Sequence, residues 1–159
     1  MQRADGTGDV QRLTDSKYSQ FPGSWHPSAK YLAFMEQNQS TGFDLMILPM
    51  AGDEASGWKP GKPTVFLNRL FAEQEPMFSP DGRWIAYYST ESGQNEVYVR
   101  PFPGPGGKWQ ISTGGGGGVY PAWSATRREL FFGTLERRIL VASYSIEGDS
   151  FRAEKPQVW

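Results

Sequence analysis

The amino-acid sequence predicts an all-β protein, and three observations support this fold class. Glycine (19 residues) and proline (12 residues) are frequent in the chain of 159 residues, which favours many short strands and turns over a few long helices. Short runs rich in β-branched and aromatic residues recur, and in Glu96–Arg100 the side chains of Val97 and Val99 share one face of an extended strand. No segment shows a 3.6-residue apolar period bounded by capping residues, so we expect no long helix.

A repeat organises these runs. Three segments align without gaps, namely Phe21–Phe34, Gln74–Tyr87 and Val119–Phe132. At one shared position they carry Trp25, Phe78 and Trp123, and at a fixed offset beyond it Lys30, Arg83 and Arg128. A third run follows over residues 44–49, 96–101 and 138–143, and a fourth over residues 64–67, 109–112 and 157–159. Because the three aromatic residues recur at matched places, we expect them to form the core between repeats rather than a unique site.

Four strands in each period of about 45–50 residues are typical of a β-propeller blade. The sequence therefore predicts three four-stranded antiparallel blades, over residues 15–67, 68–112 and 113–159. Residues 1–14 would be the end of a preceding blade, with Gln11–Thr14 as its outer strand. Propellers close with roughly four to eight blades, so we expect a partial propeller or half of a six-bladed assembly, such as a homodimer that closes the ring.

The turn between the first two strands of a blade is clearest in the central copy, Ser79-Pro80-Asp81-Gly82. Proline fixes φ, aspartate accepts hydrogen bonds from the following backbone amides, and glycine tolerates positive φ. The sequence therefore predicts a tight hairpin turn in which Asp81 has a structural role. The other two copies, residues 26–29 and 124–127, are weaker versions of this turn.

The segment Phe78–Tyr87 resembles the repeat signature of TolB-like, WD-repeat-like propellers. Asn95–Gly104, followed by Trp109–Ser112, is similar more narrowly to the propellers found C-terminal to bacterial Ser/Thr protein kinase domains. The resemblance covers nearly the whole chain and implies a propeller fold. Because such blades serve many unrelated proteins, it carries little information about function.

Composition excludes several classes of partner and chemistry. The net charge is −1, with basic and acidic residues interspersed, so we expect no binding to nucleic acid or to an anionic membrane surface. The absence of cysteine excludes disulfides and thiolate chemistry but leaves the compartment open. We expect neither a signal peptide nor a transmembrane segment in this chain, and no cofactor or metal site, because no matching motif is present.

The candidate binding residues lie in the loops that enter the inner strands, because these loops form one rim of a propeller. Aromatic rings and acids gathered on a rim could bind a peptide or a sugar, whereas the alternative is that the same side chains pack between blades. The candidate rim residues are Tyr18, Phe21, Phe71, Glu73, Gln74, Glu75 and Tyr120.

Other suggestive residues are better explained by structure. His26 is the only histidine and occupies the position of Ser79 and Ser124, so we expect a surface turn residue. The glycine runs 104–107 and 114–118 lack a P-loop ending and a following helix, and we expect loops. Glu73 and Glu75 are close in sequence, which fixes nothing about their separation in space.

Two functional hypotheses follow. The first is a non-catalytic binding or scaffolding module for a protein, a peptide or a small ligand, which within a kinase-linked parent would be the sensory part. The second is the propeller part of a hydrolase or lyase that acts on glycans or peptides. An enzyme should bring His26, or two carboxylates such as Glu73 and Glu75, together in a cleft with shifted pKa values.

Overall fold

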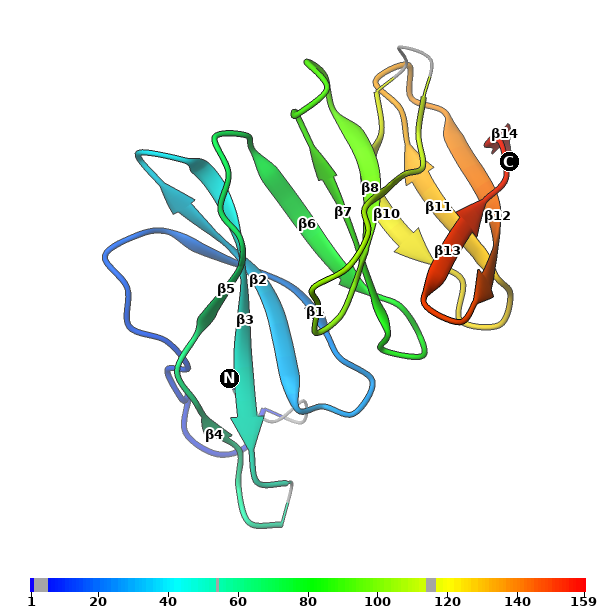
Figure 1. Ribbon diagram of the computed structural model, residues 1–159. Coiled ribbons are helices and arrows are strands. Elements are labelled where there is room, and N and C mark those ends of the chain that lie inside the picture. The colour runs from blue at the N-terminus through cyan, green and yellow to red at the C-terminus, as the bar shows by residue number, and fades with distance from the viewer. Residues whose placement is uncertain (2–5, 54, 114–116) are drawn as a thin grey trace.

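The computed structural model describes residues 1, 6–53, 55–113 and 117–159 and contains three antiparallel sheets (Figure 1). The first is formed by β1 (Gln20–Trp25), β2 (Tyr31–Asn38), β3 (Gly42–Ala51), β4 (Lys59–Pro60) and β5 (Thr64–Leu67). The second is formed by β6 (Glu73–Phe78), β7 (Trp84–Ser89), β8 (Glu96–Pro101) and β9 (Trp109–Gln110). The third is formed by β10 (Val119–Trp123), β11 (Glu129–Gly133), β12 (Ile139–Glu147), β13 (Ser150–Ala153) and β14 (Gln157–Val158).

The four predicted strands of each blade are present and pair in chain order. In the first and third sheets the long third strand, β3 or β12, also pairs near its end with an extra strand, β4 or β13, that the sequence did not predict. Residues 11–14, expected to be an outer strand, are not in a strand. The all-β class and the blade architecture are therefore confirmed. The described residues include no helix long and apolar enough to cross a membrane.

The predicted turn between the first two strands forms in the second sheet. The amide of Gly82 donates to the carbonyl of Ser79 (2.9 Å), and Gly82 has a φ of 72°. The Ser79 hydroxyl donates to the Asp81 carboxylate (2.6 Å), which also accepts from the amide of Arg83 (3.1 Å). Asp81 is thus the turn residue that the sequence predicted.

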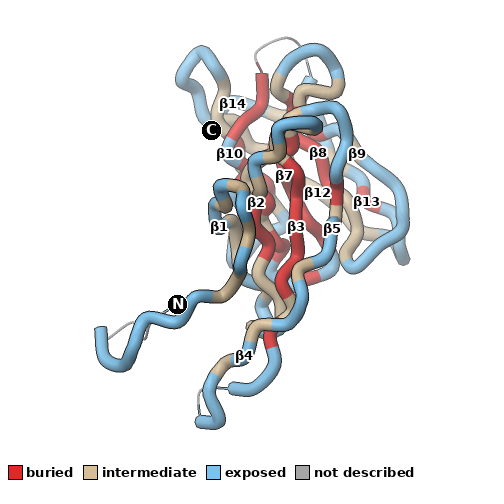
Figure 2. Tube along the Cα trace, turned by 90° about the vertical axis from the view of Figure 1, so that its left-hand side faces the viewer, coloured by how far each residue is buried: buried red, intermediate tan, exposed pale blue. Residues whose placement is uncertain are grey.

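The sheets pack face to face in chain order, with β6 beside β1 and β10 beside β6 (Figure 1). Between the first two sheets, Ala33 and Ile47 pack against Phe78 and Ile85. Between the second and third sheets lies a larger core that includes Trp84, Val97, Val99, Leu130, Phe132 and Phe151. The buried backbone runs through the middle strands of the sheets (Figure 2). The second sheet is therefore covered on both faces.

The expectation that Trp25 lies in a core is wrong, whereas its counterpart Phe78 is buried. Trp25 is 43% exposed and Phe78 is 6% exposed. Trp123 is half-buried, and its indole Nε1 donates to the carbonyl of Met77 in the second sheet (2.9 Å). The physical reason is that Phe78 and Trp123 each face a preceding sheet, whereas the described residues place no sheet on the side of the first sheet that carries Trp25.

The segment before β1 covers part of that open face. Leu13 packs against a cluster formed by Phe34, Met46, Leu48 and Met50. The Thr14 hydroxyl donates to the side-chain oxygen of Gln20 in β1 (2.5 Å). The segment thus shields the apolar centre of the face and leaves its edge near Trp25 exposed.

Candidate functional site

The first strands of the three sheets, β1, β6 and β10, lie next to one another and form the inner side of the blades. Each contains a register irregularity, between Pro22 and Ser24, between Gln74 and Met77, and between Val119 and Ala122. At this bulge Glu75 and Tyr120 both have a φ of 53°, a left-handed conformation that is uncommon for residues other than glycine. The bulge takes these two side chains out of the regular alternation of the strand.

Three of the candidate rim residues gather around Tyr88, which lies in β7. The Tyr88 hydroxyl donates to the side-chain oxygen of Gln74 (3.1 Å), and the ring of Tyr120 meets the ring of Tyr88 edge to face, with centroids 6.0 Å apart. Burial raises the pKa of Tyr88 to about 12, with smaller contributions from Tyr120 and the Glu75 carboxylate. Tyr120 itself is 66% exposed. We call Gln74, Glu75, Tyr88 and Tyr120 the inner-rim cluster.

Glu73 lies apart from this surface. It is 1% exposed and faces the first sheet, and one of its carboxylate oxygens accepts a long hydrogen bond from the amide of Arg69 (3.3 Å). Burial raises the pKa of Glu73 to about 7, against the lowering effect of Arg69, and the carboxylates of Asp44 and Glu91 add to the rise. A side chain so enclosed is out of reach of a partner, so Glu73 is a structural carboxyl group.

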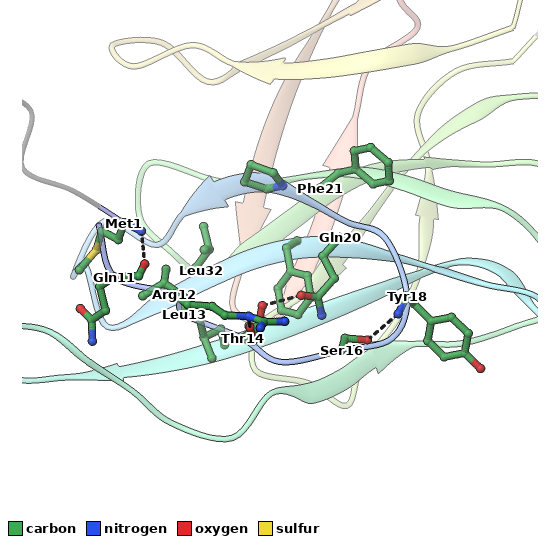
Figure 3. A pocket seen from close by; sticks show the side chains of 13 residues that line it. Met1, Gln11, Arg12, Leu13, Thr14, Ser16, Tyr18, Gln20, Phe21 and Leu32 are labelled. Atoms are coloured by element: carbon green, nitrogen blue, oxygen red, sulfur yellow. Dashed lines mark hydrogen bonds between the residues drawn. The ribbon is translucent and has the colours of Figure 1, made fainter. Parts of the chain in front are cut away.

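Tyr18 and Phe21 lie at a second location, beside the open face of the first sheet. They line a pocket of about 410 Å³ between residues 11–18 and the sheet, with Leu32, Phe34 and Leu48 on the sheet side. Figure 3 shows Thr14 and Gln20 meeting across this pocket, while the ring of Tyr18 points away from them. The structure therefore separates the predicted rim into the inner-rim cluster and this pocket.

Phe71 joins neither group. It lies in the loop between β5 and β6 and is 38% exposed. Arg69, two residues earlier in the same loop, forms an ion pair with Glu91, which also forms an ion pair with Lys108. Phe71 therefore remains an exposed loop residue.

His26 is a turn residue, as predicted, but it packs between sheets rather than lying free on the surface. Its ring lies within 5.0–5.6 Å of the rings of Tyr31, Phe78 and Phe102. It also abuts Gly82, where an added Cβ would lie 2.2 Å from Nε2 of His26. His26 is near the end of β6 that carries Phe78, whereas Glu73 begins that strand, so the two are not partners in acid–base chemistry.

The arrangement offers surface for recognition and no catalytic constellation among the described residues. The buried Glu73 is inaccessible, and the ring of His26 is engaged by other rings. No group of three or more histidine, aspartate or glutamate side chains in the described part of the chain could hold a metal ion. Of the predicted glycine loops, residues 114–116 lie outside the described residues.

Sequence reasoning missed Tyr88. Its position in the second strand of a blade is typical of a packing residue, and its contact with the rim depends on the bulge in β6 and β10. The only sequence signal was a proline at the same repeat position in two of the three inner strands, at Pro76 and Pro121, because a proline in a strand often marks an edge or a bulge.

Comparison with known proteins finds similar chains, among them the following three, and no family model matches. The Tricorn protease homolog 1 of Streptomyces coelicolor is 29% identical over 128 residues, which is 80% of this chain and 10% of that protein. The structure of a TolB-type protein from Agrobacterium tumefaciens superposes with a TM-score of 0.64 at 19% identity, covering 88% of this chain and 50% of the other. TolB of Acinetobacter baumannii gives a TM-score of 0.46 at 17% identity, over 97% and 47%.

The present chain thus spans half of the TolB-type protein from Agrobacterium tumefaciens and a tenth of the Tricorn homolog. Three successive antiparallel sheets, each with its first strand on the inner side, agree with that superposition. On its fold, the chain is therefore a run of three TolB-like β-propeller blades.

Proposed function

We propose that this chain is a non-catalytic protein-binding propeller module whose inner-rim cluster contacts a peptide segment of the partner. The observation that carries the proposal is the exposed ring of Tyr120, which a strained bulge holds against Tyr88 on the inner side of the blades. Tyrosine rings of this kind provide large, rigid contact area at low cost in conformational entropy, and aromatic residues dominate the binding energy of many interfaces.

A displayed library of random peptides, selected against the full chain, tests this proposal. Selected peptides should lose affinity at least about tenfold on Tyr120→Ala, the scale of one aromatic hot spot. Tyr18→Ala is the matched control, because Tyr18 lines the pocket of the first sheet instead of the inner rim. Retention of binding by Tyr120→Ala together with loss in Tyr18→Ala would contradict the assignment to the inner rim.

A kinase-linked context is part of the same proposal. The likeness of residues 95–112 to propellers that follow bacterial Ser/Thr kinase domains supports a role as the sensory part of such a protein. Peptide binding at the inner rim would then be the signal that regulates the kinase domain. The direct test is whether the reading frame that encodes this chain also encodes a Ser/Thr kinase domain, and a reading frame without one would remove this context.

The alternative, a propeller part of a hydrolase or lyase, is favoured by one observation, the 29% identity to a Tricorn protease homolog. In that case the blades would support peptide cleavage performed elsewhere in the assembly. An assay of the complete reading frame with fluorogenic peptides distinguishes the two functions. Cleavage of peptides that this chain binds would favour the enzyme, and binding without cleavage favours the binding module.

We also propose that a second copy of the chain covers the open sheet faces and completes six blades. The exposed face of the third sheet carries Phe131 and Trp159, whose rings meet edge to face 5.8 Å apart, and the exposed face of the first sheet carries Trp25. Sheet faces pack together at both interfaces within the chain, and the second copy would extend this packing at the edge of the first sheet that the segment before β1 leaves exposed.

Light scattering on the purified chain tests the dimer. The mass should be that of two chains, and Phe131→Asp should reduce it to that of one. Ser92→Asp, which adds a charge at an exposed turn of the second sheet, whose two faces are already covered, is the control. A single-chain mass for the unmodified protein at every concentration would contradict the proposal.

A further inference from the structure

The bulges of the inner strands differ from the other places where this chain holds a non-glycine residue at positive φ. Ala29 and Arg137 have φ values of 58° and 61°, and each donates its amide across a tight turn, to His26 and Thr134. Turns accommodate the left-handed conformation routinely. Glu75 and Tyr120 instead adopt it inside strands, at equivalent positions of two blades. Strain of this kind persists where the surroundings enforce it, and it concentrates at functional sites.

The surroundings of the bulge explain why it persists. The neighbouring inner strand approaches so closely that a Cβ added at Gly23 would lie 2.6 Å from the carbonyl oxygen of Pro76, the residue after Glu75. The Ser24 hydroxyl donates to that same carbonyl (3.1 Å) and accepts from the amide of Phe78 (2.7 Å). These contacts between the first and second sheets therefore fix the backbone from Pro76 to Phe78, directly after Glu75.

The chemistry of the cluster is that of a cation site. Glu75 supplies a carboxylate, and among the described residues no lysine or arginine forms an ion pair with it. Tyr88 and Tyr120 supply two rings at an interplanar angle of 71°. Because the Tyr88 hydroxyl donates a hydrogen bond to the side-chain oxygen of Gln74, the phenol ring is fixed in place. A carboxylate beside tyrosine rings attracts an ammonium or guanidinium group through charge and through the ring faces.

We propose that Glu75, Tyr88 and Tyr120 bind a basic group of the partner peptide, a lysine or arginine side chain or an amino terminus. This inference rests on the proposed function, since it names the chemistry that the same rim recognises. Glu75 contributes the charge, Tyr120 the exposed ring, and Tyr88 holds the geometry. The two strained bulge residues are thereby the specificity-determining positions of the module.

The composition of selected peptides is the first test. A displayed library of random peptides, selected on the full chain and eluted by competition, should be enriched in lysine and arginine. Synthetic versions of the selected peptides with the basic residue replaced by glutamine should bind at least about tenfold more weakly. Peptides that bind through Tyr120 without any basic enrichment would overturn this inference and leave the proposed function intact.

Glu75→Gln is the second test, because it removes the charge and keeps the shape. It should weaken binding of the selected basic peptides about five- to tenfold and flatten the dependence on ionic strength. Glu154→Gln, at an exposed position following β13, should change neither. Unchanged affinity and salt dependence in Glu75→Gln would overturn the inference. Failure to select any peptide that depends on Tyr120 would instead contradict the proposed function itself.

Discussion

Single residues carry the clearest physical signature of the site, which is backbone strain at Glu75 and Tyr120. Alanine is ordinarily more stable than glycine within a secondary-structure element, by roughly 0.5–1 kcal/mol. At a φ of 53° the order should reverse, because a Cβ in the left-handed region costs roughly 1–2 kcal/mol. We therefore expect Tyr120→Gly to unfold at a higher denaturant concentration than Tyr120→Ala. Equal or lower stability of the glycine variant would mean that the bulge stores no strain.

The buried carboxyl of Glu73 makes stability depend on pH. Its pKa is raised from 4.5 to about 7 by burial, so the folded state binds a proton more tightly than the unfolded chain. The contribution of Glu73 to stability is therefore most favourable below pH 4.5, becomes less favourable as pH rises through this window, and carries the full penalty above pH 7. We expect Glu73→Gln to be more stable than the unmodified chain by about 3 kcal/mol at pH 8 and equal to it near pH 4.5.

Urea titrations at several pH values measure this difference. Glu75→Gln is the control, because its carboxyl is only half-buried although it lies in the same strand. A Glu73→Gln variant that keeps the pH dependence of the unmodified chain would show that another group is responsible.

Gly82 and His26 should be coupled. Alanine at position 82 would be destabilised in two ways. Its backbone would keep a left-handed φ of 72°, and its Cβ would lie 2.2 Å from Nε2 of His26. We expect Gly82→Ala to cost about 3 kcal/mol in the unmodified chain and about 1 kcal/mol in a His26→Ala background, where only the backbone penalty remains. A double-mutant cycle in thermal unfolding gives the coupling. Additive effects would mean that the ring moves aside freely.

The role of a residue could be predicted from the sequence where its contacts lie within the same short segment, and not where they depend on another strand or sheet. Asp81 is held by bonds within its own turn, so its role was readable from Ser79–Gly82. Trp25 has the same place in the repeat as Phe78, yet its exposure is decided by the absence of a packed sheet on its side. Tyr88 belongs to the site only because a bulge in another strand brings Tyr120 to it.

At the scale of elements, the repeat predicted the four strands that recur in each blade, twelve in all, and missed two further strands, β4 and β13. The hairpin between β12 and β13 turns at Gly148-Asp149, with Glu147 paired to Ser150. Such a glycine–aspartate pair between two strands is a hairpin signal. The repeat does not predict it because the second blade has no such extra strand. A repeat finds what is common to all its copies and gives no information about what is added to some of them.

The added strand β13 is important for packing. Phe151 is buried, stacks on Tyr144 with centroids 4.9 Å apart, and meets Trp84 of the second sheet at 5.2 Å. We expect Phe151→Ala to lower the free energy of unfolding by about 3–5 kcal/mol, since it leaves a cavity between two sheets. Arg152→Ala, next to it and exposed, should change stability little. Guanidinium titrations measure both, and a small effect of Phe151→Ala would mean that the hairpin docks weakly.

For the whole molecule, the order of sheets predicts an order of local stability. The second sheet has a sheet on both sides, and every residue of β7 is buried. The short strands β4 and β14 lie at the periphery and are largely exposed. We expect amide hydrogen exchange to be slowest in β7 and β8 and fastest in β4 and β14. Mass spectrometry of exchanged peptides measures this, and slowest exchange in the first sheet would contradict it.

The prolines of the inner strands determine how a partner can approach. Pro22, Pro76 and Pro121 lie in β1, β6 and β10, each of which is the edge strand of its sheet. A proline lacks the amide that pairing requires, and the adjacent irregularity interrupts the remaining hydrogen-bonding groups. We therefore expect the inner edges of these sheets to resist extension by a foreign strand. A protein that docks at the inner edges would then be recognised mainly through side chains.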